Sequence, residues 1–99
     1  MKNVANAYTL ECGNNNDYYP TTITAEVVGD KLTNVNLQEE EGDTGPFLAT
    51  AAKNVFSFTQ GSLIIIYQIS FSEDLEVAKL AITYKSDGSI LKTDSLSCQ

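Results

Sequence analysis

The chain contains no histidine, no tryptophan and no arginine among its 99 residues. Without histidine, the catalytic triads and dyads that use an imidazole base are excluded, and so are zinc sites with histidine ligands. Six lysines stand against thirteen carboxylates, which leaves a formal net charge of −7. Because lysine and arginine provide the affinity for nucleic acids and for anionic membranes, we expect neither as a partner.

Long apolar segments are also missing. The longest continuous apolar run, 63–67, is far shorter than the ~20 residues of a membrane-spanning helix. A chain of this length with 42% hydrophobic and 19% charged residues is typical of one folded domain. We therefore predict a single domain over 1–99, in which residues 1–6 form a disordered tail.

Cysteine is scarce, and the two that occur, Cys12 and Cys98, lie near opposite ends of the chain. Their separation excludes a CxxC redox motif, and two thiols alone rarely make a metal site. They are either two free buried cysteines or a disulfide that joins the first and last strands, and we expect the disulfide. On the chain-entropy model, a bridge across so long a loop contributes roughly 4–5 kcal/mol.

A disulfide implies an oxidising compartment, yet residues 1–7 lack the apolar core of a signal peptide. We therefore expect a secreted or periplasmic protein whose sequence is the mature form, with Met1 supplied for expression.

Alternation of apolar and polar residues with a period of two dominates the chain, and no segment has a convincing helical pattern. Turns rich in glycine, asparagine and aspartate separate the alternating segments, and 29–30 and 86–89 are typical of tight hairpins. The expected strands are 8–12, 21–28, 31–38, 47–52, 55–59, 62–71, 78–84 and 90–98. A β-bulge is expected near 33–34, and 39–45 is expected to be an acidic loop.

Short connections of this kind make consecutive strands antiparallel, and closing a sheet on itself removes exposed edges. We predict an all-β fold, a small antiparallel up-and-down barrel of about eight strands closed by a Cys12–Cys98 disulfide. A two-sheet β-sandwich is the alternative.

Four carboxylates fall within five positions, at Glu39, Glu40, Glu41 and Asp43. Calcium loops need acidic ligands at staggered spacing, so these contiguous acids do not predict a metal site. They form either a solvated loop that keeps the protein soluble or a docking patch for a basic protein. A patch of this kind raises the association rate and orients the encounter.

Serines and threonines have no histidine base, and no pair of carboxylates is marked for acid–base chemistry. We predict that the protein is not an enzyme and binds no cofactor. Ile64 and Ile66 point away from the face that Ile65 and Tyr67 share, so they are either covered by another part of the chain or form a homodimer contact.

Two elements near the ends of the chain, 8–13 (YTLECG) and 97–98 (SC), resemble the early Y-x-C-like strand and C-terminal cysteine of the bacterial membrane-bound and periplasmic inhibitors of c-type lysozyme. Segment 44–47 partly resembles that family's S-G-x-x-Y element. Thr44 stands for its serine, Gly45 matches its glycine, and the last position of the element has no tyrosine. Segment 57–61 resembles its F-W-x-K-G element, with Phe58 for tryptophan and Gln60 for lysine. The resemblance implies an eight-stranded barrel that inserts these elements into the lysozyme cleft.

The leading hypothesis is therefore a non-enzymatic, extracytoplasmic protein-binding module that inhibits a cationic hydrolase such as lysozyme. Thr44, Gly45 and Gln60 are expected on one rim, with 39–43 steering the basic partner. The alternatives are a carrier that holds a small ligand inside the barrel and a self-associating surface or structural protein.

Overall fold

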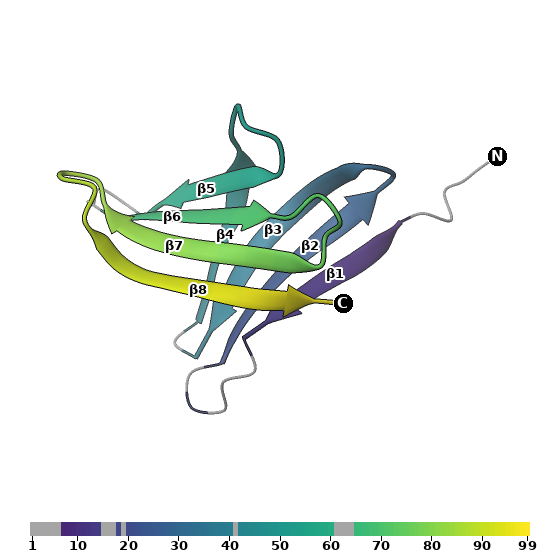
Figure 1. Ribbon diagram of the computed structural model, residues 1–99, viewed down its shortest axis with the longest axis horizontal. Coiled ribbons are helices and arrows are strands. Elements are labelled where there is room, and N and C mark those ends of the chain that lie inside the picture. Colours follow the sequence, from purple (N-terminus) through teal and green to yellow (C-terminus); the bar gives the residue numbers. More distant parts are fainter. Residues whose placement is uncertain (1–6, 15–17, 19, 41, 61–64) are drawn as a thin grey trace.

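The computed structural model describes residues 7–14, 18, 20–40, 42–60 and 65–99 (Figure 1). The strands are β1 (Tyr8–Gly13), β2 (Thr21–Val28), β3 (Lys31–Glu39), β4 (Gly42–Ala49), β5 (Val55–Thr59), β6 (Ile65–Phe71), β7 (Val77–Tyr84) and β8 (Ile90–Cys98). They follow one another in sequence order around a closed antiparallel barrel. The predicted all-β barrel is confirmed, whereas the predicted tail at 1–6 lies outside the described residues.

The two-residue alternation of the sequence places apolar side chains inside the barrel and polar side chains outside it. In β2, Ile23, Ala25 and Val27 are buried, while the residues between them are half-buried or exposed. β7 repeats this pattern with Ala78, Leu80 and Ile82. Because successive side chains of a strand point to opposite faces, each strand contributes one apolar row to the interior.

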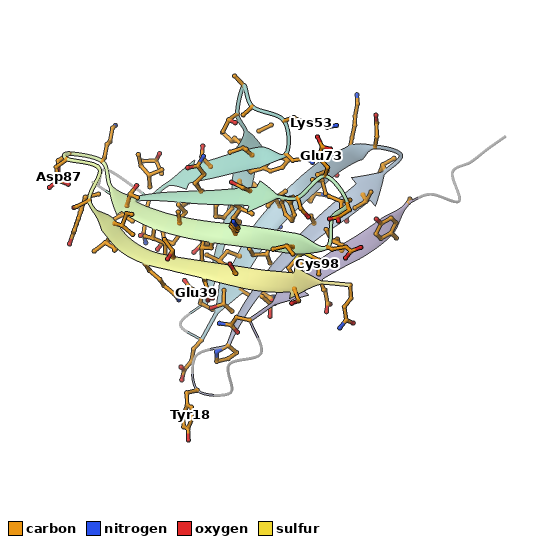
Figure 2. The ribbon with its side chains drawn as sticks, in the orientation of Figure 1. Tyr18, Glu39, Lys53, Glu73, Asp87 and Cys98 are labelled. Carbon is orange, nitrogen blue, oxygen red and sulfur yellow. A yellow bond between two sulfur atoms is a disulfide. The ribbon has the colours of Figure 1, made fainter. Side chains whose placement is uncertain are left out.

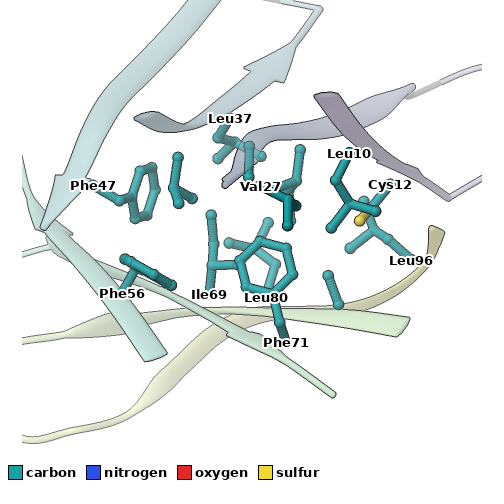
Figure 3. Close-up of a cluster of buried hydrophobic side chains, with 14 of the residues drawn as sticks. Leu10, Cys12, Val27, Leu37, Phe47, Phe56, Ile69, Phe71, Leu80 and Leu96 are labelled. Carbon is teal, nitrogen blue, oxygen red and sulfur yellow. The ribbon is translucent and has the colours of Figure 1, made fainter. Parts of the chain in front are cut away.

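Buried hydrophobic side chains from all eight strands fill the interior (Figure 3). Phe56 and Phe71 meet edge to face across this core, with ring centroids 5.9 Å apart. Every buried side-chain nitrogen or oxygen of the described residues has a hydrogen-bond partner. The largest fully buried side chains are those of Ile23, Leu37, Ile69, Leu80, Leu96, Val35 and Cys12.

Two seams of the barrel are short. Within the described part of the chain, β4 pairs with β5 only at Leu48 and Ala49, and β1 pairs with β8 only at Cys12 and Gly13. The seams divide the barrel into two halves, β1–β4 and β5–β8, whose strands cross in Figure 1. The closed barrel therefore keeps one feature of the alternative sandwich, two sheets that pack across a shared core.

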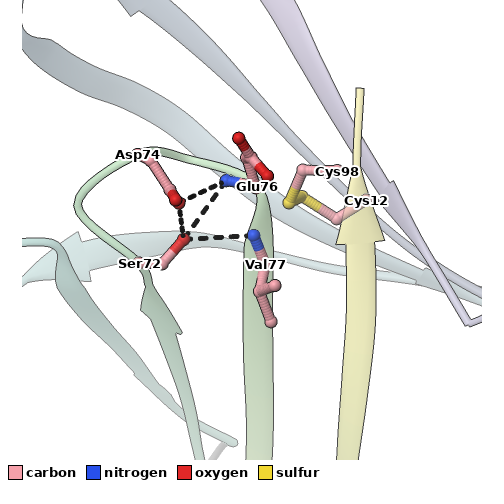
Figure 4. Close-up of a disulfide and its surroundings, with 6 residues drawn as sticks. All are labelled: Cys12, Ser72, Asp74, Glu76, Val77 and Cys98. Atoms are coloured by element: carbon pink, nitrogen blue, oxygen red, sulfur yellow. Dashed lines mark hydrogen bonds between the residues drawn. A yellow bond between two sulfur atoms is a disulfide. The ribbon is translucent and has the colours of Figure 1, made fainter.

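The disulfide closes the second of these seams. Cys12 and Cys98 are paired residues of β1 and β8, and their sulfur atoms are bonded at 2.04 Å (Figure 4). Beside them, the amide of Gln99 donates a hydrogen bond to the carbonyl oxygen of Glu11 at 2.8 Å. The predicted disulfide is confirmed, and a disulfide suggests an oxidising environment.

The expected boundaries around the acidic segment are wrong. β4 begins at Gly42 and ends at Ala49, so the second half of the predicted loop 39–45 is strand, and 50–52 is not. Pairing of Gly42 with Glu39 and of Asp43 with Gln38 continues the β3–β4 ladder almost to its turn. These backbone hydrogen bonds outweigh the low strand propensity of glycine and aspartate.

β3 contains a bulge, and the described part of β6 is shorter than the strand expected there. The expected bulge near 33–34 is confirmed, because the β2–β3 register shifts there and Asn34 has a φ of 51°. The described part of β6 begins at Ile65, and the earlier residues of the predicted strand 62–71 lie outside the described residues.

No helix in the described ranges is long and apolar enough to cross a membrane.

Candidate functional site

The acidic residues lie where β3 turns into β4. Glu39 is the last residue of β3, Glu40 lies in the turn, and Asp43 is the second residue of β4, with Glu40 and Asp43 exposed. Glu41 lies outside the described residues. In an up-and-down barrel, the β3–β4 and β5–β6 connections lie at the same end, so Gln60, which follows β5, shares this end. We refer to Glu39, Glu40, Asp43, Thr44, Gly45 and Gln60 as the acidic rim.

Gly45 marks a close approach between β3 and β4. Its φ is +140°, and a Cβ at this position would lie 2.5 Å from Asn36 Oδ1 and 3.2 Å from the carbonyl oxygen of Val35. Any other residue would therefore be strained and crowded. Its neighbour Thr44 pairs with Leu37 and is half-buried, so part of its surface is available to a partner.

An aromatic cluster joins the two segments of the rim. The ring of Phe47 lies 5.7 Å from that of Phe58 and 6.4 Å from that of Tyr67, measured between centroids. The Tyr67 hydroxyl donates a hydrogen bond to Gln60 Oε1 at 3.3 Å. Side chains of β4, β5 and β6 thus connect the strand that carries Gly45 with Gln60.

The sequence alone did not identify this cluster. The alternation of apolar residues places Phe58 and Tyr67 inside the barrel, but contacts between β4, β5 and β6 depend on pairing across the fold. Register supplies that information, because Phe58 is paired directly with Tyr67.

One member of the acidic rim has a structural partner. Lys92 Nζ of β8 lies 3.4 Å from Glu39 Oε2, and both side chains are partly exposed. Nearby, Asn14 Nδ2 donates a hydrogen bond to Asp94 Oδ2 at 3.0 Å. Both contacts join β8 to the β1–β4 half of the barrel. Figure 2 labels Glu39 of this group. Glu39 therefore helps to hold the barrel closed, and Glu40 and Asp43 supply the outward charge.

Lowered carboxyl pKa values occur away from the rim. The Ser72 hydroxyl and the amide of Glu76 donate hydrogen bonds to Asp74, and these bonds lower the pKa of its carboxyl (Figure 4). The amide and hydroxyl of Ser89 lower the pKa of Asp87 in the same way. Both aspartates are exposed and stabilise tight turns, so their pKa shifts have a structural cause.

The described residues form several open hollows in the surface. One of about 190 Å³ lies beside the disulfide, between Glu11, Thr22 and Ser97, and one of about 220 Å³ lies between β1 and β2. A larger hollow of about 580 Å³ lies on the outer face of β6–β8. Among the described residues, no group of three or more acids or cysteines is arranged to hold a metal ion.

The predicted homodimer contact falls on the outer face of β6. Ile66 is half-buried there, and Ile64 lies outside the described residues. Ile66 pairs with Thr83, which in turn pairs with Ile90, so the two isoleucines lie in one outward row across three strands. Ile90 is 69% exposed. Ile90 opens the last alternating segment of the sequence, and alternation alone does not mark it as a contact residue.

No protein-family model, curated protein or solved structure matches this chain. The function is therefore inferred from the residues of the rim and their geometry.

Proposed function

We propose that the protein is a non-enzymatic, extracytoplasmic module that binds a basic protein through the acidic rim and inhibits a cationic hydrolase such as lysozyme. The observation that carries this proposal is the position of two exposed carboxylates, Glu40 and Asp43, at the barrel end that also presents Gly45 and Gln60.

Electrostatics supports a basic partner. The chain carries a net charge of −7, and the described rim acids gather at one end of a rigid barrel. Opposite charge on a partner raises the association rate by steering the encounter, while the fixed backbone holds the carboxylates in register. Glu39 is held by Lys92, so a partner gains most from Glu40 and Asp43.

The shape of the rim supports insertion into a cleft. Gly45 has no side chain, and the Tyr67–Gln60 hydrogen bond orients the Gln60 amide beside the aromatic cluster. A rim ordered before binding loses little conformational entropy in the complex. The resemblance to the lysozyme inhibitors points to the same two segments, and Gln60 takes the position of their lysine.

The filled interior favours this function over that of a carrier. Phe47, Phe56, Ile69, Phe71 and Leu80 occupy the centre of the barrel, each at most 7% exposed. A small-ligand site typically needs about 300–1,000 Å³ of concave space. Among the described residues, a hollow of that size lies on the outer face of β6–β8.

Lysozyme turnover in the presence of the protein tests the proposal. We expect a stoichiometric amount of protein to lower turnover at micromolar concentration, and inhibition to weaken as salt is raised, because screening reduces attraction between exposed charges. Combining Glu40→Gln with Asp43→Asn removes two rim charges and is expected to weaken inhibition by about fivefold or more.

The matched control removes the same charge elsewhere. Asp30 and Glu73 are exposed acids in the turns at the opposite end of the barrel. Asp30→Asn combined with Glu73→Gln should change inhibition by less than about twofold, because these turns are far from the rim. Unaltered lysozyme turnover with the wild-type protein would remove the inhibitor function. Equal losses from the two double variants would remove the rim as the binding surface.

A further inference from the structure

The outer face of β5–β8 differs in charge from the rest of the molecule. We call the outward-facing positions of β5, β6, β7 and β8 the neutral face. Strand alternation and register place serine, threonine, glutamine, alanine, valine and isoleucine there, and Lys79 is its one charged side chain. The face contains no carboxylate, in a chain that has thirteen.

The other half of the barrel lacks this property. The outer face of β1–β4 carries Glu11, Glu26 and Asp43. Further acids lie in the turns beside the neutral face: Glu73 between β6 and β7, and Asp87 between β7 and β8, at the left edge of Figure 2. Asp94 belongs to β8 but points the other way, because its carboxylate accepts a hydrogen bond from Asn14.

The neutral face has both projections and a hollow. The long, exposed Gln68 and Lys79 border a hollow of about 580 Å³. The small residues Ser70, Ala81 and Ser95 also line it, and so does Asp94. At its edge, Ile66 and the exposed Ile90 form the apolar row described above. A surface that carries both knobs and holes can complement itself across a two-fold axis.

We propose that the neutral face docks a second copy of this chain. Two molecules with a net charge of −7 repel each other over most of their surface, and this face lets their backbones approach without opposing carboxylates. In the complex, Gln68 and Lys79, which border the hollow of each copy, pack against the other copy, and the Ile66–Ile90 row is removed from water. This proposal is independent of the acidic rim.

The size of the face sets the strength of the dimer. Four strands about 4.8 Å apart and rows about 6.7 Å apart give a face of roughly 20 by 25 Å. Two such faces bury about 1,000 Å² in total, at the lower limit for specific association. The dimer is therefore weak, and it forms as concentration rises.

Sedimentation velocity over about 10 µM to 1 mM protein, at low and at high salt, tests this. We expect a reversible monomer–dimer equilibrium that salt strengthens, because salt screens the repulsion between the two acidic molecules. Gln68→Glu adds one carboxylate to each neutral face with little change in side-chain size, and it should weaken the dimer by about tenfold or more.

Gln38→Glu provides the matched control. Gln38 is an exposed glutamine on the outer face of β3, so the variant has the same charge and the same type of substitution. It should shift the equilibrium by less than about twofold, and melting curves of both variants report whether the fold is retained. Ile90→Ser, which adds no charge, should also weaken the dimer.

Three results would overturn the proposal. A protein that remains monomeric at the highest concentration and salt does not dock a second copy on this face, and any occupant is then a different molecule. Equal effects of Gln68→Glu and Gln38→Glu would show that net charge alone matters. A dimer that Gln68→Glu and Ile90→Ser leave unchanged forms through another surface.

Discussion

Two glycines of β4, Gly42 and Gly45, adopt a backbone conformation that favours glycine, and Gly45 belongs to the acidic rim. Gly42 and Gly45 both have a φ near +140°, where residues with a side chain are strained. They differ in their surroundings: nothing lies within 4 Å of a Cβ added to Gly42, whereas Asn36 would obstruct one at Gly45. Comparing substitutions at Gly42 and Gly45 therefore separates the free-energy cost of backbone strain from the cost of crowding by Asn36.

Gly45→Ala is expected to lower the free energy of unfolding by roughly 2–4 kcal/mol, because backbone strain and the contact with Asn36 act together. Gly42→Ala should cost only the backbone part, about 1–2 kcal/mol. Urea unfolding of both variants measures the difference. Equal losses would show that Asn36 moves aside freely and that the approach of β3 to β4 is not tight.

At the scale of elements, the turn between β6 and β7 depends on ionised Asp74. The Ser72 hydroxyl accepts hydrogen bonds from the amides of Glu76 and Val77, and Leu75 adopts a φ of 58° (Figure 4). The Cys98 amide donates to the Glu76 carbonyl oxygen at 2.9 Å, so this turn also adjoins the end of β8. A loosened turn would therefore affect the closing strand.

The lowered pKa of Asp74 gives this turn a pH dependence of known sign. Its carboxylate contributes stability above the ordinary pKa of 3.8 and loses it as pH falls through the lowered pKa of the folded state. Asp74→Asn should therefore destabilise the protein at pH 7 and less so near about pH 2–3. Urea unfolding at both pH values measures the gap. A gap independent of pH would contradict the role of the ionised carboxylate.

Strands could be predicted from the sequence where apolar and polar side chains alternate. Strand boundaries were harder to predict where they depend on pairing with a neighbouring strand. Ile23, Ala25 and Val27 identify β2 and its buried face without other information. The start of β4 was misplaced, because Gly42 and Asp43 join a strand only through their pairing with β3. The Phe47–Phe58–Tyr67 cluster and the neutral face combine residues of several strands, so their recognition required the register.

At the scale of the whole molecule, closure rests on few backbone pairs. β1 and β8 meet at two paired positions of the described chain, and the disulfide lies at one of them. Beyond these positions, β8 is joined to the other half of the barrel by the Lys92–Glu39 ion pair and the Asn14–Asp94 hydrogen bond. Partly exposed ion pairs contribute little, so the covalent bond is the main support of this seam.

Replacing both Cys12 and Cys98 by serine should therefore lower the free energy of unfolding by roughly 4–5 kcal/mol on the chain-entropy model. Hydrogen exchange at the Gln99 amide, which donates to Glu11, should accelerate strongly, while amides of the β6–β7 ladder should keep their relative order of protection. A loss below about 1 kcal/mol with unchanged exchange at Gln99 would show that the seam holds without its covalent bond.

The pairing of Cys98 with Cys12 also has a consequence for biosynthesis. Of the eight strands β1 is synthesised first, but its partner on one side is β8, which is synthesised last. The ring of strands can close only after synthesis has reached Cys98, which pairs with Cys12. Until then β1 presents a free edge, and oxidation of the two thiols seals the ring only once both strands are present.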